Sequence, residues 1–185
     1  MIALRNLVSV RLLFLAGLMV WLGAAPARAQ SATAPELKAA LVLNFARFAT
    51  WPEIGPDTAI VLCVFGDDRV ADALSLAVRG QTIGGRGLQV AKLSAGASPR
   101  ACQLLFVGAP ELRLAAPLLD SARTLPVLTV SDGARFSQST GMVELFADAG
   151  RMRFAINIDA VGRSRLSLSS RLLGLAKIVR DEHVQ

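Results

Sequence analysis

The sequence predicts a single-domain, three-layer α/β sandwich, in which helices cover both faces of a mostly parallel central sheet. Uncharged, β-branched runs alternate with segments of helical spacing, which is the order expected of strand–helix–strand units. These runs have no polar face, and strands buried on both sides are typical of parallel sheets. Near the end of the chain, apolar and polar residues alternate around a short glycine turn, which indicates an antiparallel C-terminal hairpin.

The first expected element is a helix from about Thr33 to Thr50. Thr33 and Glu36 have the spacing of a capping box, and Pro35 lies in the first turn, where its missing N–H costs little. Pro52 disfavours helical geometry in the residue before it and ends the helix. Apolar residues lie on nearly all sides of this segment, so we expect a helix that is buried or that covers one face with a partner.

Strand-like runs and helical segments then alternate through the middle of the chain. The most apolar runs end at glycine, serine or aspartate, which favour turns. The expected strands are residues 59–65, 88–93, 102–107 and 126–130, and the expected helices are residues 70–79 and 111–123.

The C-terminal third is expected to contain the hairpin and one more long helix. Residues 141–147 and 151–158 flank a short turn that contains Gly150, and the second strand alternates apolar and polar residues. Asp159 is expected to cap a short turn or helix that follows the hairpin. Helical spacing of apolar residues predicts a final helix over residues 169–180.

The first 29 residues have the three parts of a secretory signal peptide. Arg5 and Arg11 give a basic start, residues 12–25 carry no charge, and Ala27 and Ala29 form an A-x-A cleavage signal. The uncharged run is shorter than the roughly 20 residues that span a bilayer. We therefore expect cleavage after Ala29 and a periplasmic domain of residues 30–185, with an uncleaved membrane anchor as the alternative.

The charge of the chain does not indicate a nucleic-acid partner. Three of its 20 Lys and Arg residues lie before residue 30, so the net charge of +6 falls to +3 after cleavage. The remaining basic residues are scattered, which is typical of a solvated surface.

The residue inventory does not assemble a standard catalytic or metal site. A hydrolase of the serine type needs a histidine close to its nucleophile, but the single histidine, His183, lies near the end of the sequence. Asp67, Asp132 and Glu144 could in principle form a carboxylate pair, but the aromatic residues that line sugar clefts are scarce. We predict no enzyme activity, no catalytic residue, no metal and no cofactor.

The two cysteines, Cys63 and Cys102, are expected to form a disulfide. An even cysteine count in an exported protein favours a bridge, with two buried free thiols as the alternative. Closing a loop of about 40 residues would stabilise the fold by roughly 4 kcal/mol on the chain-entropy model.

Two groups of polar residues are candidates for a ligand crevice. One group follows the predicted strands, because ligands of open parallel sheets bind beyond the carboxyl ends of the strands, although turns favour the same residues. The other group begins the last expected helix and offers hydroxyls, free N–H groups and a cation to an anion, although it also fits an ordinary cap. These candidates are Gly66, Asp67, Ser131 and Asp132, and Ser169, Ser170 and Arg171.

Seven segments of this chain resemble the YfiR family of periplasmic proteins. They occur in the right order and cover nearly all of the region that follows the signal peptide. The segments are LNFARFATWP (43–52), LCVFGDD (62–68), CQLLFV (102–107), PVLTVSD (126–132), GM (141–142), FAIN (154–157) and SSRLL (169–173).

The resemblance implies a function that composition does not indicate. Proteins of the YfiR family bind the periplasmic sensing domain of an inner-membrane diguanylate cyclase, YfiN, and hold it inactive, which lowers cyclic di-GMP and restrains biofilm growth. A YfiB-like lipoprotein of the outer membrane can draw the repressor away, and the family is associated with homodimers. It is also associated with a redox-dependent disulfide. Cys63 and Cys102 match family cysteines, but the second pair of some relatives is absent here.

A repressor of this kind needs an adhesive surface, and we expect the first helix or the expected final helix to help form it. We predict that Asn44, Phe48 and Trp51 contribute to a partner or dimer surface, whereas core packing is at least as good an account of Phe45 and Leu41. The second functional hypothesis is a small-ligand-binding module that acts on another membrane receptor, such as a sensor kinase.

Overall fold

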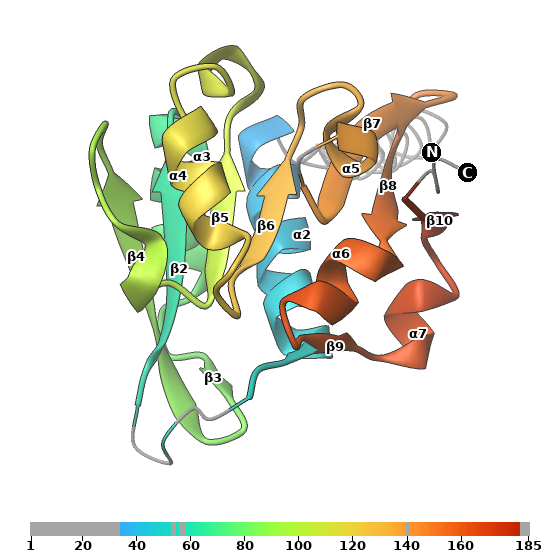
Figure 1. Cartoon of the computed structure of the whole chain (residues 1–185). Coiled ribbons are helices and arrows are strands. Elements are labelled where there is room, and N and C mark those ends of the chain that lie inside the picture. The colour runs from blue at the N-terminus through green and yellow to red at the C-terminus, as the bar shows by residue number, and fades with distance from the viewer. Residues whose placement is uncertain (1–33, 53–54, 56–57, 140, 182–185) are drawn as a thin grey trace, which may run out of the picture. The chain divides into compact units, whose positions relative to one another are not determined.

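The computed structural model describes residues 34–52, 55, 58–139 and 141–181 (Figure 1). The expected signal peptide, the capping residue Thr33 and the lone histidine His183 lie outside these residues. Within the described ranges, every helix is too short or too polar to cross a membrane.

A central sheet of eight strands organises the described part of the chain. In spatial order the strands are β10 (Lys177–Val179), β8 (Arg151–Asn157), β7 (Val143–Asp148), β6 (Leu128–Ser131), β5 (Leu104–Val107), β2 (Ile60–Phe65), β4 (Arg86–Leu93) and β3 (Thr82–Ile83). The pairs from β4 through β2, β5 and β6 to β7 are parallel, as is the pair of β8 and β10. The β7–β8 and β3–β4 pairs are antiparallel. This mostly parallel sheet confirms the predicted α/β class.

Helical segments lie between the strands and on both sides of the sheet. In chain order they are α2 (Ala34–Phe48), α3 (Asp68–Ala77), the 3-10 helices η1 (Pro99–Ala101) and η2 (Ala109–Glu111), α4 (Ala116–Ala122), α5 (Phe136–Ser139), α6 (Ile158–Arg163) and α7 (Ser170–Leu173).

Side chains of the middle strands β2, β5 and β6 point alternately into two core layers, one on each face of the sheet. In β2, Leu62 and Val64 pack in the core that α2 and α3 cover, while Cys63 and Phe65 pack in the core that α4 covers. Figure 1 shows α4 in front of the sheet and α2 behind it. No side of these strands faces water, which explains why their sequence carries no polar alternation.

The first helix is anchored in the larger core. Phe45 is fully buried, and its ring meets the ring of Phe154 edge-on with centroids 5.1 Å apart. α2 ends at Phe48, two residues before the expected end, because β1 (Ala49–Thr50) pairs with β9 (Ser167–Leu168) in a small antiparallel sheet. Core packing therefore accounts for Phe45.

The expected helix over residues 111–123 is interrupted. The 3-10 helix η2 ends at Glu111, and α4 begins only at Ala116. Pro117 lies in the first turn of α4, where a missing N–H needs no partner. In the interior of one continuous helix the same proline would remove a main-chain hydrogen bond, so the chain starts a new helix there.

The C-terminal hairpin is confirmed, with a two-residue turn. Asp148 pairs with Arg151, which leaves Ala149 and Gly150 as the loop. Both have positive φ, 47° and 74°, as a type I′ turn requires.

Asn157, not Asp159, caps α6, so that expectation is wrong. The Oδ1 atom of Asn157 accepts a hydrogen bond from the Ala160 N–H at 2.9 Å. Asp159 accepts instead from the Asp181 N–H at 3.0 Å and pairs with Arg180 at 3.4 Å. Asp159 therefore holds the segment after β10 rather than the start of α6.

The prediction of a long final helix over residues 169–180 is also wrong. α7 is a single turn that ends at Leu173, and residues 177–179 then form the edge strand β10 beside β8. The apolar spacing in this segment suits a helix, but a short apolar run also suits a strand. The main-chain N–H and C=O groups along one side of β8 need hydrogen-bond partners, and they favour the strand over the helix. These groups are in place only once the sheet has assembled.

Candidate functional site

The carboxyl ends of the middle strands come together, as expected, and a lysine from α2 reaches into them. Asp67 follows β2 and Asp132 follows β6. The Lys38 Nζ atom lies 2.5 Å from an Asp132 carboxylate oxygen and 3.8 Å from an Asp67 carboxylate oxygen. All three side chains are only 17–18% exposed. Sequence reasoning missed Lys38, because nothing local connects it to residues 29 and 94 positions away.

Main-chain donors hold the same two carboxylates in place. Asp132 accepts from the Ala109 N–H at 2.8 Å, which ties the end of β6 to the end of β5. Asp67 caps α3 by accepting from the Val70 N–H at 3.1 Å. Ser131 is fully buried, and its hydroxyl accepts from the Gly133 N–H at 3.0 Å. Asp67 and Asp132 thus connect the ends of β2 and β6 to the helices α2 and α3.

Two glycines close the gap between the ends of β2 and β5. The Gly108 N–H donates to the Phe65 carbonyl at 2.9 Å. A Cβ atom at Gly108 would lie 2.8 Å from the Gly66 carbonyl oxygen, so only glycine fits this approach. Gly66 itself has φ of 76°, which also favours glycine. Gly66 and Asp67 also line a surface pocket of about 390 Å³, together with Glu111 and Leu114.

The second candidate group lies elsewhere. The Ser169 N–H donates to the carbonyl of Phe48, the last residue of α2, whereas Lys38 lies near the start of that helix. Ten residues of helix separate Phe48 from Lys38, or about 15 Å. The Ser169 hydroxyl caps α7 through the Leu172 N–H, and Ser170 and Arg171 are exposed beside it. The structure therefore divides the candidate crevice residues between the two ends of α2.

The two cysteines form a disulfide inside the α4-side core. Cys63 and Cys102 are bridged, with Cα atoms 5.8 Å apart, and both are almost completely buried. The bridge joins β2 to the segment that leads into β5. Leu105 and Leu119 belong to the same core cluster, so apolar side chains pack around the bridge.

The predicted partner residues differ in how much they expose. Asn44 is exposed, Phe48 is partly buried, and Trp51 is buried with its indole N–H donating to the Gln103 carbonyl at 2.7 Å. Trp51 therefore faces inward. Asn44 and Phe48 continue a stripe along α2 with Leu37 and Leu41, at spacings of three and four residues.

An apolar groove of about 620 Å³ runs between α2 and α3, next to that stripe. Ala40 lines it from α2, and Ala73, Leu76 and Ala77 line it from α3. Leu76 is 61% exposed and Leu37 is 39% exposed. The exposure of Leu76 could not be predicted from the sequence, because it depends on how α3 packs against α2.

Comparison with protein families decides which proteins this chain is related to. The YfiR/HmsC-like family model matches residues 35–177. The chain belongs to the YfiR/HmsC-like family. A search among curated proteins finds no match.

Membership of the YfiR/HmsC-like family gives the coarse function. It indicates a periplasmic regulator in diguanylate cyclase signalling, rather than an enzyme, that works with a partner of that signalling system. Asp67, Asp132 and Glu144, the acids considered for a carboxylate pair, each accept main-chain hydrogen bonds. Glu144, for example, accepts hydrogen bonds from the Arg135 N–H and from the N–H and hydroxyl of Ser137. Within the described ranges, no group of three or more His, Cys, Asp and Glu side chains is arranged to hold a metal ion.

Proposed function

We propose that this YfiR/HmsC-like protein binds the periplasmic sensing domain of an inner-membrane diguanylate cyclase and holds the cyclase inactive. Cytoplasmic cyclic di-GMP would fall as a result. The family match over residues 35–177 carries the proposal. The export that it requires is supported by the signal-peptide pattern of residues 1–29, with cleavage after Ala29.

The groove between α2 and α3 supports the proposal as the cyclase contact. Large apolar side chains that stay exposed around a groove are typical of protein interaction sites. Leu76 lies in the groove and Leu37 lies near it on α2, and both keep a large exposed fraction. Glu36, Arg69 and Asp72 bring charges of both signs to the groove, which would favour one orientation of the partner.

The stripe on α2 is partly exposed and supports a second contact, since Leu37 and Asn44 are exposed and Leu41 and Phe48 are partly buried. Leu37, Leu41, Asn44 and Phe48 follow one line along the helix, whereas Glu36 and Ala40 turn toward the groove. We assign the homodimer contact to the stripe and the cyclase contact to the groove. A YfiB-like outer-membrane lipoprotein would then release the cyclase by competing for the groove.

A pair of matched leucine variants tests this assignment. Leu76 and Leu114 are exposed to a similar degree, 61% and 57%, but only Leu76 lines the groove. The Leu76→Asp variant should lose affinity for the cyclase periplasmic domain by about tenfold or more, since it places a charge at the centre of an apolar contact. The Leu114→Asp variant should bind as the parent protein does, and circular dichroism should show both variants folded.

Measurements in cells separate the contact from the function. Deleting the gene should raise cyclic di-GMP, and restoring the parent protein or Leu114→Asp should lower it again, whereas Leu76→Asp should not. Equal binding by both variants would refute the groove as the contact. Unchanged cyclic di-GMP after deletion would refute the regulatory function, and recovery of a sensor kinase instead of a cyclase after cross-linking would favour the alternative function.

A further inference from the structure

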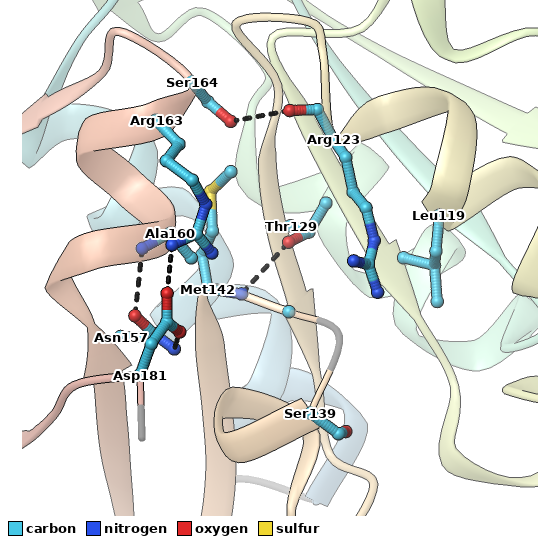
Figure 2. A pocket seen from close by; sticks show the side chains of 11 residues that line it. Leu119, Arg123, Thr129, Ser139, Met142, Asn157, Ala160, Arg163, Ser164 and Asp181 are labelled. Carbon is cyan, nitrogen blue, oxygen red and sulfur yellow. Dashed lines mark hydrogen bonds and ion pairs between the residues drawn. The ribbon is translucent and has the colours of Figure 1, made fainter. Parts of the chain in front are cut away.

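A small polar pocket lies on the α4 side of the sheet, away from the groove of α2 and α3. Its cavity volume is about 70 Å³. α4, α6 and the segment after β10 supply three charged groups around it, Arg123, Arg163 and Asp181. Figure 2 shows Arg123 on one side and Arg163 with Asp181 on the other, with Met142 and Thr129 between them.

The Asp181 carboxylate already binds two donors of this pocket, the Asn157 amide and the Arg163 guanidinium. One of its oxygens accepts from the Asn157 amide at 2.9 Å, and the other pairs with Arg163. Arginine and an amide N–H form the set that carboxylates prefer, because a planar guanidinium and a neutral donor can bind both oxygens. The pocket thus already holds one carboxylate, supplied by the protein itself.

Asn157 is a prearranged donor rather than a mobile surface group. Its side chain is almost completely buried. Its Oδ1 atom caps α6 through the Ala160 N–H, and its Nδ2 group also donates to the Ser137 carbonyl at 2.9 Å. These bonds fix the amide, so its remaining N–H keeps its direction toward the Asp181 position whether or not that carboxylate is present.

The charges around the pocket favour an anion. Two guanidinium groups and one carboxylate line it, and its other lining residues are uncharged. Arg123 pairs with Asp120 on its own helix in an exposed contact at 3.3 Å, and such surface pairs are weak. A second carboxylate is therefore attracted to this pocket and competes with Asp181 for Arg163 and Asn157.

We propose that the pocket binds a small carboxylate molecule, and that Asp181 is a built-in competitor for it. The volume allows a ligand of about four to eight non-hydrogen atoms, on the scale of acetate to succinate. Binding replaces one carboxylate by another, so it displaces the Asp181 side chain from Arg163 and Asn157. The Asp181 N–H can stay on Asp159, which keeps β10 in the sheet while the side chain moves.

Titration of ¹⁵N-labelled protein with sodium acetate, sodium succinate and neutral acetamide tests the proposal. Both carboxylates should shift the Asn157 side-chain amide signals, and acetamide should not. The Asp181→Ala variant should bind the carboxylates about tenfold or more tightly, since a charge-assisted competitor has been removed. Adding Arg163→Ala to Asp181→Ala should abolish binding.

A matched variant on the hairpin gives the control. Asp148 forms an exposed ion pair with Arg153 at 3.4 Å, so Asp148→Ala removes a comparable surface acid at another site. It should leave carboxylate affinity unchanged. The proposal fails if neither carboxylate shifts the Asn157 signals in the parent or in Asp181→Ala, if acetamide shifts them equally, or if Asp148→Ala and Asp181→Ala change the affinity alike. If Asp181 were purely structural, its removal would destabilise the segment after β10 without tightening the binding of any anion.

Discussion

Replacing Lys38 by Met should destabilise the fold strongly, although the residue lies near the surface. Methionine keeps most of the aliphatic stem and removes the ammonium group. The Asp132 carboxylate then loses a partner at 2.5 Å and the Asp67 carboxylate loses one at 3.8 Å, while both stay mostly buried. The lost interaction, rather than lost packing, should dominate the change.

The magnitude follows from the exposure of these groups. Exposed ion pairs contribute about 0–1 kcal/mol. Removing one partner of a fully buried pair costs about 3–5 kcal/mol. The Lys38 contacts lie near the buried limit, but Asp132 keeps the Ala109 N–H and Asp67 keeps the Val70 N–H. We therefore expect a loss of about 2–4 kcal/mol, which lowers the melting temperature by about 5–15 °C in a domain of this size.

Urea denaturation followed by circular dichroism measures this loss. The slope of the transition should stay the same, because the variant changes a contact and not the surface exposed on unfolding. The double variant Lys38→Met/Asp132→Asn should recover at least half of the loss, since asparagine carries no charge but can still accept from Ala109.

An exposed lysine provides the comparison. Lys92 pairs with Asp68 and Asp72, and its side chain is about half exposed. Lys92→Met should change the melting temperature very little. If Lys38→Met lost no more stability than Lys92→Met, the argument that burial makes the Lys38 contacts strong would be wrong.

Two further variants and the pH dependence of Lys92→Met probe other parts of the fold. Replacing Cys63 and Cys102 by Ala should cost about 4 kcal/mol for a bridge that spans 39 residues, and a thiol assay on the native disulfide protein should detect free thiols only after denaturation and reduction. Ala149→Asn should raise the melting temperature, because Ala149 has φ of 47° and asparagine tolerates that region better; an unchanged or lower value would contradict this. Hydrogen bonds, first to Asp72 and then to Asp68, raise the pKa of Lys92. The contribution of Lys92 to stability should therefore be complete below the ordinary lysine pKa and should disappear as the pH rises through the higher folded-state pKa. Denaturation of Lys92→Met in alkaline solution should lack this part of the pH dependence.

Local patterns were enough for the elements that the sheet buries on both sides. Residues 59–65, 102–107 and 126–130 are apolar because two helix layers cover them, and the structure places β2, β5 and β6 there. The two-residue turn at Gly150 likewise follows from the turn chemistry of the chain itself.

Local patterns failed where a neighbour far away in the sequence makes the choice. Residues 177–179 have apolar spacing that suits a helix, but β8 offers them a strand partner. Pro117 could have kinked a long helix, but it begins a new one. In both places the chain had two local conformations of similar free energy, and tertiary contacts selected one of them.

The sites show the same division. The paired cysteines and the acids at the strand ends could be proposed from residue type and position alone, because disulfides and strand ends have general rules. The partners of these acids could not, because Lys38 lies on another element. Arg123, Arg163 and Asp181 likewise share a pocket although they come from separate parts of the chain.

By itself, the sequence determined the α/β class, the export pattern and the family. Apolar runs, turn residues and the order of the motifs can all be recognised from residue types and their spacing. Only the tertiary structure decided which polar groups are already satisfied and which apolar side chains remain exposed. Both properties depend on distances between residues that the sequence does not bring together, and those distances are set when the helices pack on the sheet.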